Sequence, residues 1–342
     1  MARYFRSSFL VTACGIVLGG FIGWEATGTL SGAMTTTFIV IVLGVLEVSL
    51  SFDNAVVNAK VLQGMDAVWR QRFITWGMAI AVFGMRVVFP LVIVAVITGT
   101  GLWSALVLAV TNPDGFAAAI TAAHVSVSAF GGAFLAMVGL RHFFDHEKDV
   151  HWLAVIERPL ARLGRIEAVA LGIVLLLLYG MAGWLPEHER LTFLRAGIGG
   201  LVTYIAVDGV AALLESEPSA GTVVRSGAAG FLYLEVLDAS FSFDGVIGAL
   251  ALSHNLFVIT IGLGIGAMFV RSLTIMLVEE GTLTEYRFLK HGAFWAIIAL
   301  GGIMLLETVR EVSEVVTGLI GAAFIAAAFV SSVRHNRRAH GG

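Results

Sequence analysis

The chain has 342 residues, of which 58% are hydrophobic and 13% are charged, and its mean hydropathy is +0.91. One soluble core of this size cannot bury so much apolar sequence, so the composition excludes a soluble domain and predicts an all-α, polytopic membrane protein. The net charge of −3 gives no reason to expect nucleic acid as a partner, and the single cysteine, Cys14, excludes an internal disulfide.

Windows of about 20 apolar residues predict ten membrane-spanning helices. In chain order, we expect them near residues 8–24, 36–60, 72–98, 124–142, 167–184, 194–214, 228–253, 256–278, 293–307 and 319–333. Residues 101–123 are also apolar, but the turn signal TNPDG at 111–115 divides them into two halves that are too short to cross. We therefore expect this segment to be a re-entrant or extracytoplasmic excursion.

The distribution of basic residues predicts the orientation of these helices. With a cytoplasmic N-terminus and a non-crossing 101–123 segment, 16 of the 21 lysines and arginines lie in cytoplasmic segments. Only Arg190, Arg195 and Arg310 lie outside, and Arg86 and Arg271 fall within helices. Basic residues favour the cytoplasmic side, so we predict a multi-pass protein of the inner (plasma) membrane with both termini cytoplasmic.

A sequence repeat divides the chain into parts. Residues 47–54, EVSLSFDN, reappear in altered form as residues 238–245, DASFSFDG, at an offset of 191 residues. In each copy the span that follows is glycine-rich and ends in an arginine, Arg86 or Arg271. Because the copies fall in the second and seventh spans, which cross in opposite directions, they predict two inverted three-helix repeats.

The repeat predicts five regions along the chain. They are an N-terminal transmembrane helix (1–35), a first repeat (36–142), a cytoplasmic loop with two connecting transmembrane helices (143–227), a second repeat (228–307), and a last transmembrane helix with a basic cytoplasmic tail (308–342). We expect the histidines of the loop, His142 and His146, to lie on a solvated, mixed-charge surface rather than in a metal site.

Buried charges point to a functional site between the repeats. Six acids and two bases lie well inside the predicted spans: Glu47, Asp53, Asp208, Glu235, Asp238, Asp244, Arg86 and Arg271. Each isolated charge costs about 2.5–3.5 kcal/mol at a helix centre. Six acids cannot all pair with two bases, so either several are protonated or a cation completes the balance.

The residue types favour a hard cation as the ligand of this site. Carboxylate, amide, hydroxyl and carbonyl oxygens suit Mn²⁺, Mg²⁺ or Ca²⁺. The candidate metal ligands are Asp53, Asn54, Asp244, Glu47 and Asp238. Charge-pairing or structural roles are expected for Arg86, Arg271, Glu235 and Asp208.

Helix geometry leaves the arrangement of these groups open. At about 100° per residue, Glu47 and Asp53 point about 120° apart in a straight helix. Either the helix unwinds around residues 51–53, or Asp53 and Asp244 meet across the pseudo-two-fold axis while Glu47 and Asp238 contact the arginines. In the second case each arginine is expected to clamp a carboxylate of the other repeat. A third interpretation ties all the carboxylates up in structural arginine clamps.

The residues of the repeat resemble a known family. Segments 46–55 (LEVSLSFDNA) and 237–244 (LDASFSFD), with Gly84-Met85-Arg86 and the residues ending at Arg271, resemble the TerC family of integral membrane proteins associated with tellurium resistance and manganese efflux. The resemblance covers about 36–142 and 228–307. It implies a LysE-like transporter fold with Asp53, Asn54 and Asp244 as ion ligands.

These observations lead to a functional expectation. We expect an integral membrane transporter that exports a divalent cation, with Mn²⁺ as the first candidate and protons as the exchanged ion. The alternative is a membrane scaffold that assembles factors for metal or tellurite stress or supplies metal to exported proteins; amino-acid export is a third reading. No serine or cysteine forms an evident pair with a histidine, so we expect neither an enzyme nor a resident cofactor, and the sequence names no protein partner.

Overall fold

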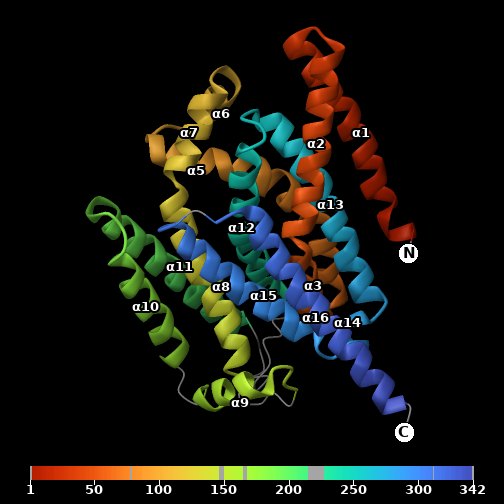
Figure 1. Ribbon diagram of the computed structural model, residues 1–342, viewed down its shortest axis with the longest axis vertical. Helices are drawn as coiled ribbons and strands as arrows, with labels where there is room; N and C mark the ends of the chain where they lie inside the picture. Colours follow the sequence, from red (N-terminus) through yellow and green to blue (C-terminus); the bar gives the residue numbers. More distant parts are fainter. Residues whose placement is uncertain are drawn as a thin grey trace.

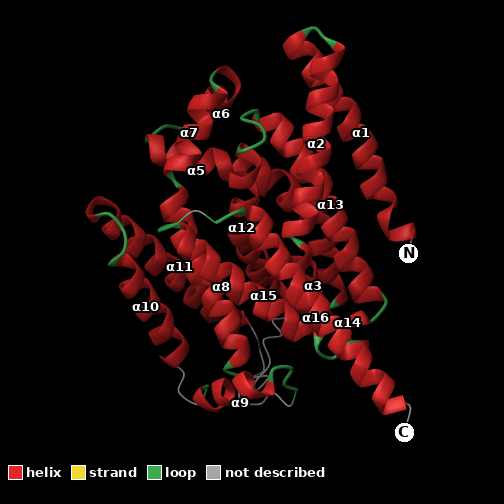
Figure 2. Ribbon diagram, in the orientation of Figure 1, coloured by secondary structure: helices red, strands yellow, loops and turns green. Residues whose placement is uncertain are grey.

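The computed structural model describes residues 2–77, 79–145, 150–164, 168–214, 227–310 and 312–340. Within these ranges the chain is helical and contains no strand (Figure 2). The expected all-α fold is therefore confirmed, and the many apolar helices make it a multi-pass membrane protein.

Eight of the described helical segments are long and apolar enough to cross a membrane. They are Arg3–Thr27 of α1 (Ala2–Thr27), α2 (Leu30–Leu50), Ile80–Thr98 of η2 and α5, α8 (His124–Phe143), Glu187–Val210 of α11 (Glu187–Leu214), α13 (Leu256–Glu279), α15 (Leu289–Glu307) and Val316–Arg338 of α16 (Glu314–His340). Each corresponds to one of the ten predicted spans.

The other two predicted spans have features that set them apart. The helix α10 (Ala168–Ala182) has 15 residues and forms, with α9 (Ala154–Leu163), a pair bent by 108°. The helix α12 (Gly227–Leu250) has 24 residues but carries three acids, Glu235, Asp238 and Asp244. The number of ten crossings thus stays a prediction, because one of these helices is short and the other is unusually acidic.

The predicted span 36–60 is broken. The helix α2 ends at Leu50, and α3 (Phe52–Gly64) begins two residues later. Ser51, at the break, has φ −104° and ψ 15°, which lies outside the α-helical region. The interruption falls where one of the two sequence alternatives expected unwinding, although it is confined to one residue. The second copy of the repeat lies within the continuous helix α12, so the two copies differ locally, and the inverted repeat stays a prediction.

The segment after α4 (Ala67–Arg72) has wide helical turns. It contains two π-helices, η1 (Phe73–Gly77) and η2 (Ile80–Val88), and continues into α5 (Phe89–Thr98). Its expected counterpart in the second repeat, α13, is an ordinary α-helix. Because π-helical turns are rare and often occur at functional sites, this segment makes the region around Arg86 a candidate functional site.

Residues 101–123 form two short helices. These are α6 (Leu102–Thr111) and α7 (Pro113–Ala122), each of 10 residues and about 15 Å long. Neither reaches across a hydrocarbon core of about 30 Å. Asn112 separates them, and its side chain accepts a hydrogen bond from the Gly115 N–H at 3.0 Å. The interruption expected from TNPDG is therefore present, and α6 and α7 pack beside α5 (Figure 1).

The bundle is built around α8, which packs against α11 and α15, while α13 packs against α1 and α2 (Figure 1). At each end of the helix bundle, side-chain contacts join segments that are distant in the sequence. At one end Tyr4 hydrogen-bonds Glu280, and Arg287 contacts His335 of α16. At the other end Asp114 contacts His254. The predicted cytoplasmic segments thus lie together, as an alternating topology requires.

One loop expectation is wrong. His142 lies in the last turn of α8 and stacks on Phe294, with ring centroids 3.7 Å apart. It is part of the packing between α8 and α15, because its ring lies on the side of the last helical turn that faces Phe294. His146 lies outside the described residues.

Candidate functional site

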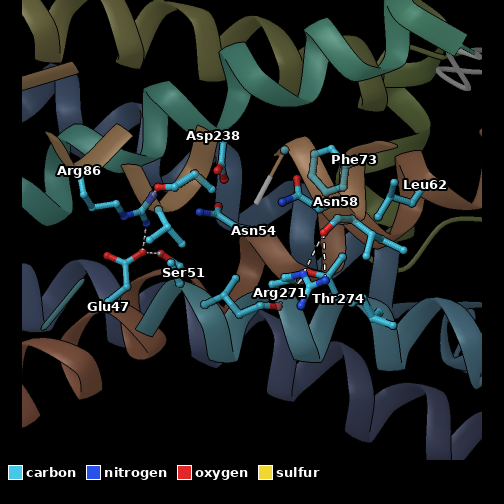
Figure 3. A pocket seen from close by; sticks show the side chains of 17 residues that line it. Glu47, Ser51, Asn54, Asn58, Leu62, Phe73, Arg86, Asp238, Arg271 and Thr274 are labelled. Carbon is cyan, nitrogen blue, oxygen red and sulfur yellow. Dashed lines mark hydrogen bonds and ion pairs between the residues drawn. The ribbon is translucent and has the colours of Figure 1, made fainter. Parts of the chain in front are cut away.

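A polar cavity lies between α2, α3, the π-helices, α12 and α13 (Figure 3). Its accessible volume is about 50 Å³, which gives room for about three to five water molecules or a partly hydrated ion. Polar side chains reach it from α2, α3, η2, α12 and α13 and from the break between α2 and α3: Glu47, Ser51, Asn54, Asn58, Arg86, Asp238, Arg271 and Thr274. In a membrane protein such a concentration of polar groups between apolar helices indicates a functional site.

One wall is a polar stripe along α2 and α3. Glu47, Ser51, Asn54 and Asn58 follow one another at intervals of four, three and four residues and all line the cavity. This spacing places side chains on one helical face. Sequence reasoning named Glu47 and Asn54 but missed Asn58, although its position four residues after Asn54 was a usable signal.

Arg86 and Glu47 form a buried ion pair at one end of the cavity. Arg86 donates to the Glu47 carboxylate and, through Nη1, to the Ala81 carbonyl at 2.6 Å. The Ser51 hydroxyl donates to Oε1 of Glu47 at 3.0 Å. The two ionic side chains are only 6% and 2% exposed, so each charge depends on the other for its solvation.

Arg271 has a different kind of partner. Its Nε and Nη2 both donate to the backbone carbonyl of Ile74 in η1, at 3.2 and 3.0 Å. The expected clamps between repeats are therefore corrected: Arg86 holds Glu47 of its own repeat, and Arg271 holds a carbonyl instead of a carboxylate. The wide turn η1 lies beside Arg271, and its carbonyl takes the place of an acid.

Two carboxylates of α12 face this region. Asp238 lines the cavity and lies within electrostatic range of Arg86 and Glu47, beside the amide of Asn58. Glu235 approaches the wall at Gly77, where an added Cβ would lie 2.9 Å from its Oε1. The missing side chain of Gly77 thus makes room for the Glu235 carboxylate, which sequence reasoning had assigned a charge-pairing or structural role.

Several oxygen atoms at the site have no protein partner among the described residues. They are Oδ1 of Asn54, Oδ1 of Asn58 and both carboxylate oxygens of Glu235. A buried polar atom without a hydrogen bond costs about 1–3 kcal/mol. These four atoms are acceptors, which a cation, a proton or a water molecule can satisfy; Nε of Arg86, a donor on the same cavity wall, also has no partner among the described residues.

Asp53 points elsewhere. Its side chain is buried, accepts a hydrogen bond from the Asn54 N–H at 3.1 Å, and does not line the cavity. Its Oδ2 lies 3.7 Å from the position of a Cβ on Gly321, on the side of α16. The side chain of Asp244 lies outside the described part of the structure, so the predicted pairing of Asp53 with Asp244 stays a prediction. Asp208 lies on α11, away from the cavity lining.

The described residues do not contain a preformed chelate. No three histidine, cysteine, aspartate or glutamate side chains among them lie close enough together to hold one metal ion. Here Glu47 is occupied by Arg86, which leaves Asp238, Glu235 and the two amides as the acceptors nearest the cavity. A cation in this conformation would keep several of its water ligands.

Comparison with known proteins identifies a family but no function. No curated protein and no solved structure matches the chain, and the resemblance to TerC proteins stays a prediction. The sequence model of a protein family of unknown function, DUF475, matches residues 52–339. This range contains α3, the π-helices, α12 and α13, and therefore most of the cavity wall. The chain belongs to the DUF475 family.

Proposed function

We propose that this protein transports a divalent cation across the membrane, exporting Mn²⁺ in exchange for protons. The observation that carries the proposal is the set of buried acceptor oxygens without protein partners among the described residues. Those of Asn54 and Asn58 line the cavity together with Asp238, and those of Glu235 lie beside its wall at Gly77. Membrane interiors penalise such groups unless a ligand or proton satisfies them.

The chemistry of the lining supports a hard cation. Among the described residues no histidine, cysteine or methionine lines the cavity, and the potential donors there are carboxylate, amide and hydroxyl oxygens. Such oxygen donors suit Mn²⁺ and Mg²⁺ better than softer metals. Manganese is the first candidate because of the resemblance to TerC proteins.

The pairing of acids supports exchange against protons. Glu235 and Asp238 are three residues apart on α12 and interact electrostatically. Two nearby carboxylates in a poorly solvated site repel each other unless a cation or a proton lies between them. Loss of the metal therefore favours uptake of a proton, which is the elementary step of an exchanger.

The shape of the cavity supports access from one side. Figure 3 shows Glu47 and Arg86 at one end and Leu62 at the other. Leu62 belongs to the last turn of α3, next to the segment that contains Arg70. This is the end predicted to be cytoplasmic, so an exported ion would enter past Leu62 and meet the ion pair of Glu47 last.

The proposal is tested by the manganese content of cells grown in manganese excess, with and without the protein. Cells with the protein should accumulate less manganese, and Asp238→Asn should remove this protection at near-normal membrane abundance, whereas Asp53→Asn, at a position off the cavity, should keep it. A scaffold would instead lose abundance in these variants. Equal manganese content with and without the protein would contradict export.

A further inference from the structure

The helix α9 (Ala154–Leu163) has three distinct faces. At about 100° per residue, Glu157 and Ala161 share a side that is buried against the protein. Val155, Ile156 and Leu163 share a second side, with exposed fractions of 90%, 48% and 45%. Arg158 and Arg162 lie next to this apolar side and are also exposed. One face is thus docked, one is apolar and one is basic.

The docked face is held by a fully buried carboxylate. Glu157 is 1% exposed and accepts hydrogen bonds from the N–H groups of Trp152 and Leu153, at 3.1 and 3.2 Å. It also contacts Nδ1 of His291 at 2.9 Å and Nε1 of Trp295 at 3.2 Å, both on α15. These bonds fix the rotation of α9, so its apolar and basic faces are turned outward by the structure.

The direction of α9 matches the plane of a membrane. Its axis makes an angle of 108° with α10, the apolar helix that follows it. If α10 crosses the bilayer, α9 lies along the surface, and Figure 1 shows it crosswise at the lower end of the bundle. The two arginines of α9 have no ion-pair partner among the described residues.

We propose that α9 is an interfacial helix that binds anionic phospholipid headgroups. Its apolar face enters the boundary between headgroups and acyl chains, and Arg158 and Arg162 pair with lipid phosphates beside it. A helix with one apolar and one basic face lies in this position in membranes, and each basic residue near an anionic surface adds to the binding. The proposal does not depend on the transported substrate.

The test measures the depth of α9 in vesicles. A nitroxide is attached at Val155→Cys in a Cys14→Ser background, which removes the only other cysteine. The full chain is placed in vesicles of phosphatidylcholine alone or of a three-to-one mixture with phosphatidylglycerol. The ratio of oxygen to nickel-chelate accessibility should be several-fold higher at position 155 than at His188→Cys, whose native side chain is 80% exposed. Equal ratios would overturn the proposal.

Charge dependence separates headgroup binding from simple apolar burial. The accessibility ratio at position 155 should rise further in the anionic mixture, and Arg158→Gln/Arg162→Gln should abolish that rise. The matched control Arg334→Gln/Arg337→Gln removes the same charge from α16 and should keep it. High salt should also abolish the rise in the labelled chain that keeps Arg158 and Arg162, because salt screens exposed charges. A rise that persists in the α9 variant and in high salt would contradict recognition of anionic lipid.

Discussion

At the scale of single residues, the carboxylates around the cavity differ in how many hydrogen-bond and ion-pair partners they have. Glu47 receives Arg86 and the Ser51 hydroxyl, whereas Glu235 receives no hydrogen bond from the described residues. A carboxylate that is fully paired contributes to folding, and one that is buried without a partner is available to a ligand. In the proposed exchange Glu47 therefore anchors the site, while Glu235 and Asp238 are the acids that take up the cation or the proton.

Because Arg86 pairs with a carboxylate and Arg271 with a carbonyl, replacing each by leucine should lower the free energy of unfolding by different amounts. Arg86→Leu leaves the buried Glu47 carboxylate without its counter-charge and should lower stability by about 3–5 kcal/mol. Arg271→Leu leaves only the Ile74 carbonyl unpaired and should cost about 1–3 kcal/mol. The folded fraction in detergent, followed by size-exclusion chromatography during heating, measures both. Equal stability of the two variants would show that the ion pair is not the anchor.

The amide of Asn58 allows a separate prediction about binding. Asn58→Leu replaces an acceptor oxygen that has no protein partner among the described residues, but it also removes the amide beside Asp238, so the fold should be retained at a cost of no more than about 1–3 kcal/mol. Cation affinity should fall at least about tenfold if the amide oxygen is a ligand. Calorimetric titration of the purified protein with Mn²⁺ measures this, and unchanged affinity with an intact fold would remove Asn58 from the site.

At the scale of helices, the position of Glu47 depends on the close approach of α2 and α13. A Cβ added at Gly266 would lie 2.4 Å from Cβ of Glu47 and 2.8 Å from the Gly44 carbonyl. No real side chain tolerates these distances, so the two helices can only approach because position 266 is glycine. The same helix offers a contrast at Gly264, where the nearest atom, Cγ1 of Val82, lies 3.5 Å away.

The matched pair Gly266→Ala and Gly264→Ala tests this packing. Gly266→Ala should cost about 1–3 kcal/mol, because α13 must move away from α2. Gly264→Ala should be neutral or slightly stabilising, since alanine favours helix and meets only ordinary contact. Thermal unfolding in the same detergent compares them. Similar melting temperatures for the two variants would contradict the close packing at Glu47.

The ends of the membrane helices could be predicted from the sequence, but the irregularities within them could not. Spans such as 124–142 and 256–278 agree with α8 and α13 within two residues, because long apolar runs determine where a membrane helix begins and ends. The break at Ser51 and the π-helical turns around Arg86 have no such signal. They coincide with local hydrogen bonds that an apolar run does not specify, from Ser51 to Glu47 and from Arg86 to the Ala81 carbonyl.

The site was also predictable only in part. Sequence reasoning placed Glu47, Asn54 and Asp238 in the functional region, and all three line one cavity. It grouped Asp53 with the metal ligands, although Asp53 lies about 120° from Glu47 around a straight helix. In the structure Asp53 does not line the cavity, and its carboxylate is turned toward α16.

At the scale of the whole molecule, topology links the cavity to a direction of transport. The contacts between Arg3 and Glu279, and between Asn336 and Glu285, bring both chain ends to the same end of the bundle. The excess of basic residues predicts that this end faces the cytoplasm. The end of the cavity at Leu62 is then the one nearer the cytoplasm, and because Leu62 is only 1% exposed, the proposed export requires this end to open during transport.

Cysteine labelling tests this orientation. In a Cys14→Ser background, Arg334→Cys should react with an impermeant maleimide only after the cells are permeabilised. His188→Cys, in the first turn of α11, should react in intact cells. Labelling of position 334 from outside would invert the topology and turn the proposed export into uptake.

The most direct measurement of the central claim is manganese flux into vesicles that contain only the purified protein. A manganese-sensitive dye inside the vesicles should report uptake by the unmodified chain, with movement of protons in the opposite direction. Asp238→Asn keeps the size of the side chain but removes its charge, and should reduce flux at least about tenfold. Asp114→Asn makes the same change at an 86% exposed position and should leave flux unchanged. No flux through the unmodified protein, or full flux through Asp238→Asn, would contradict transport at this cavity.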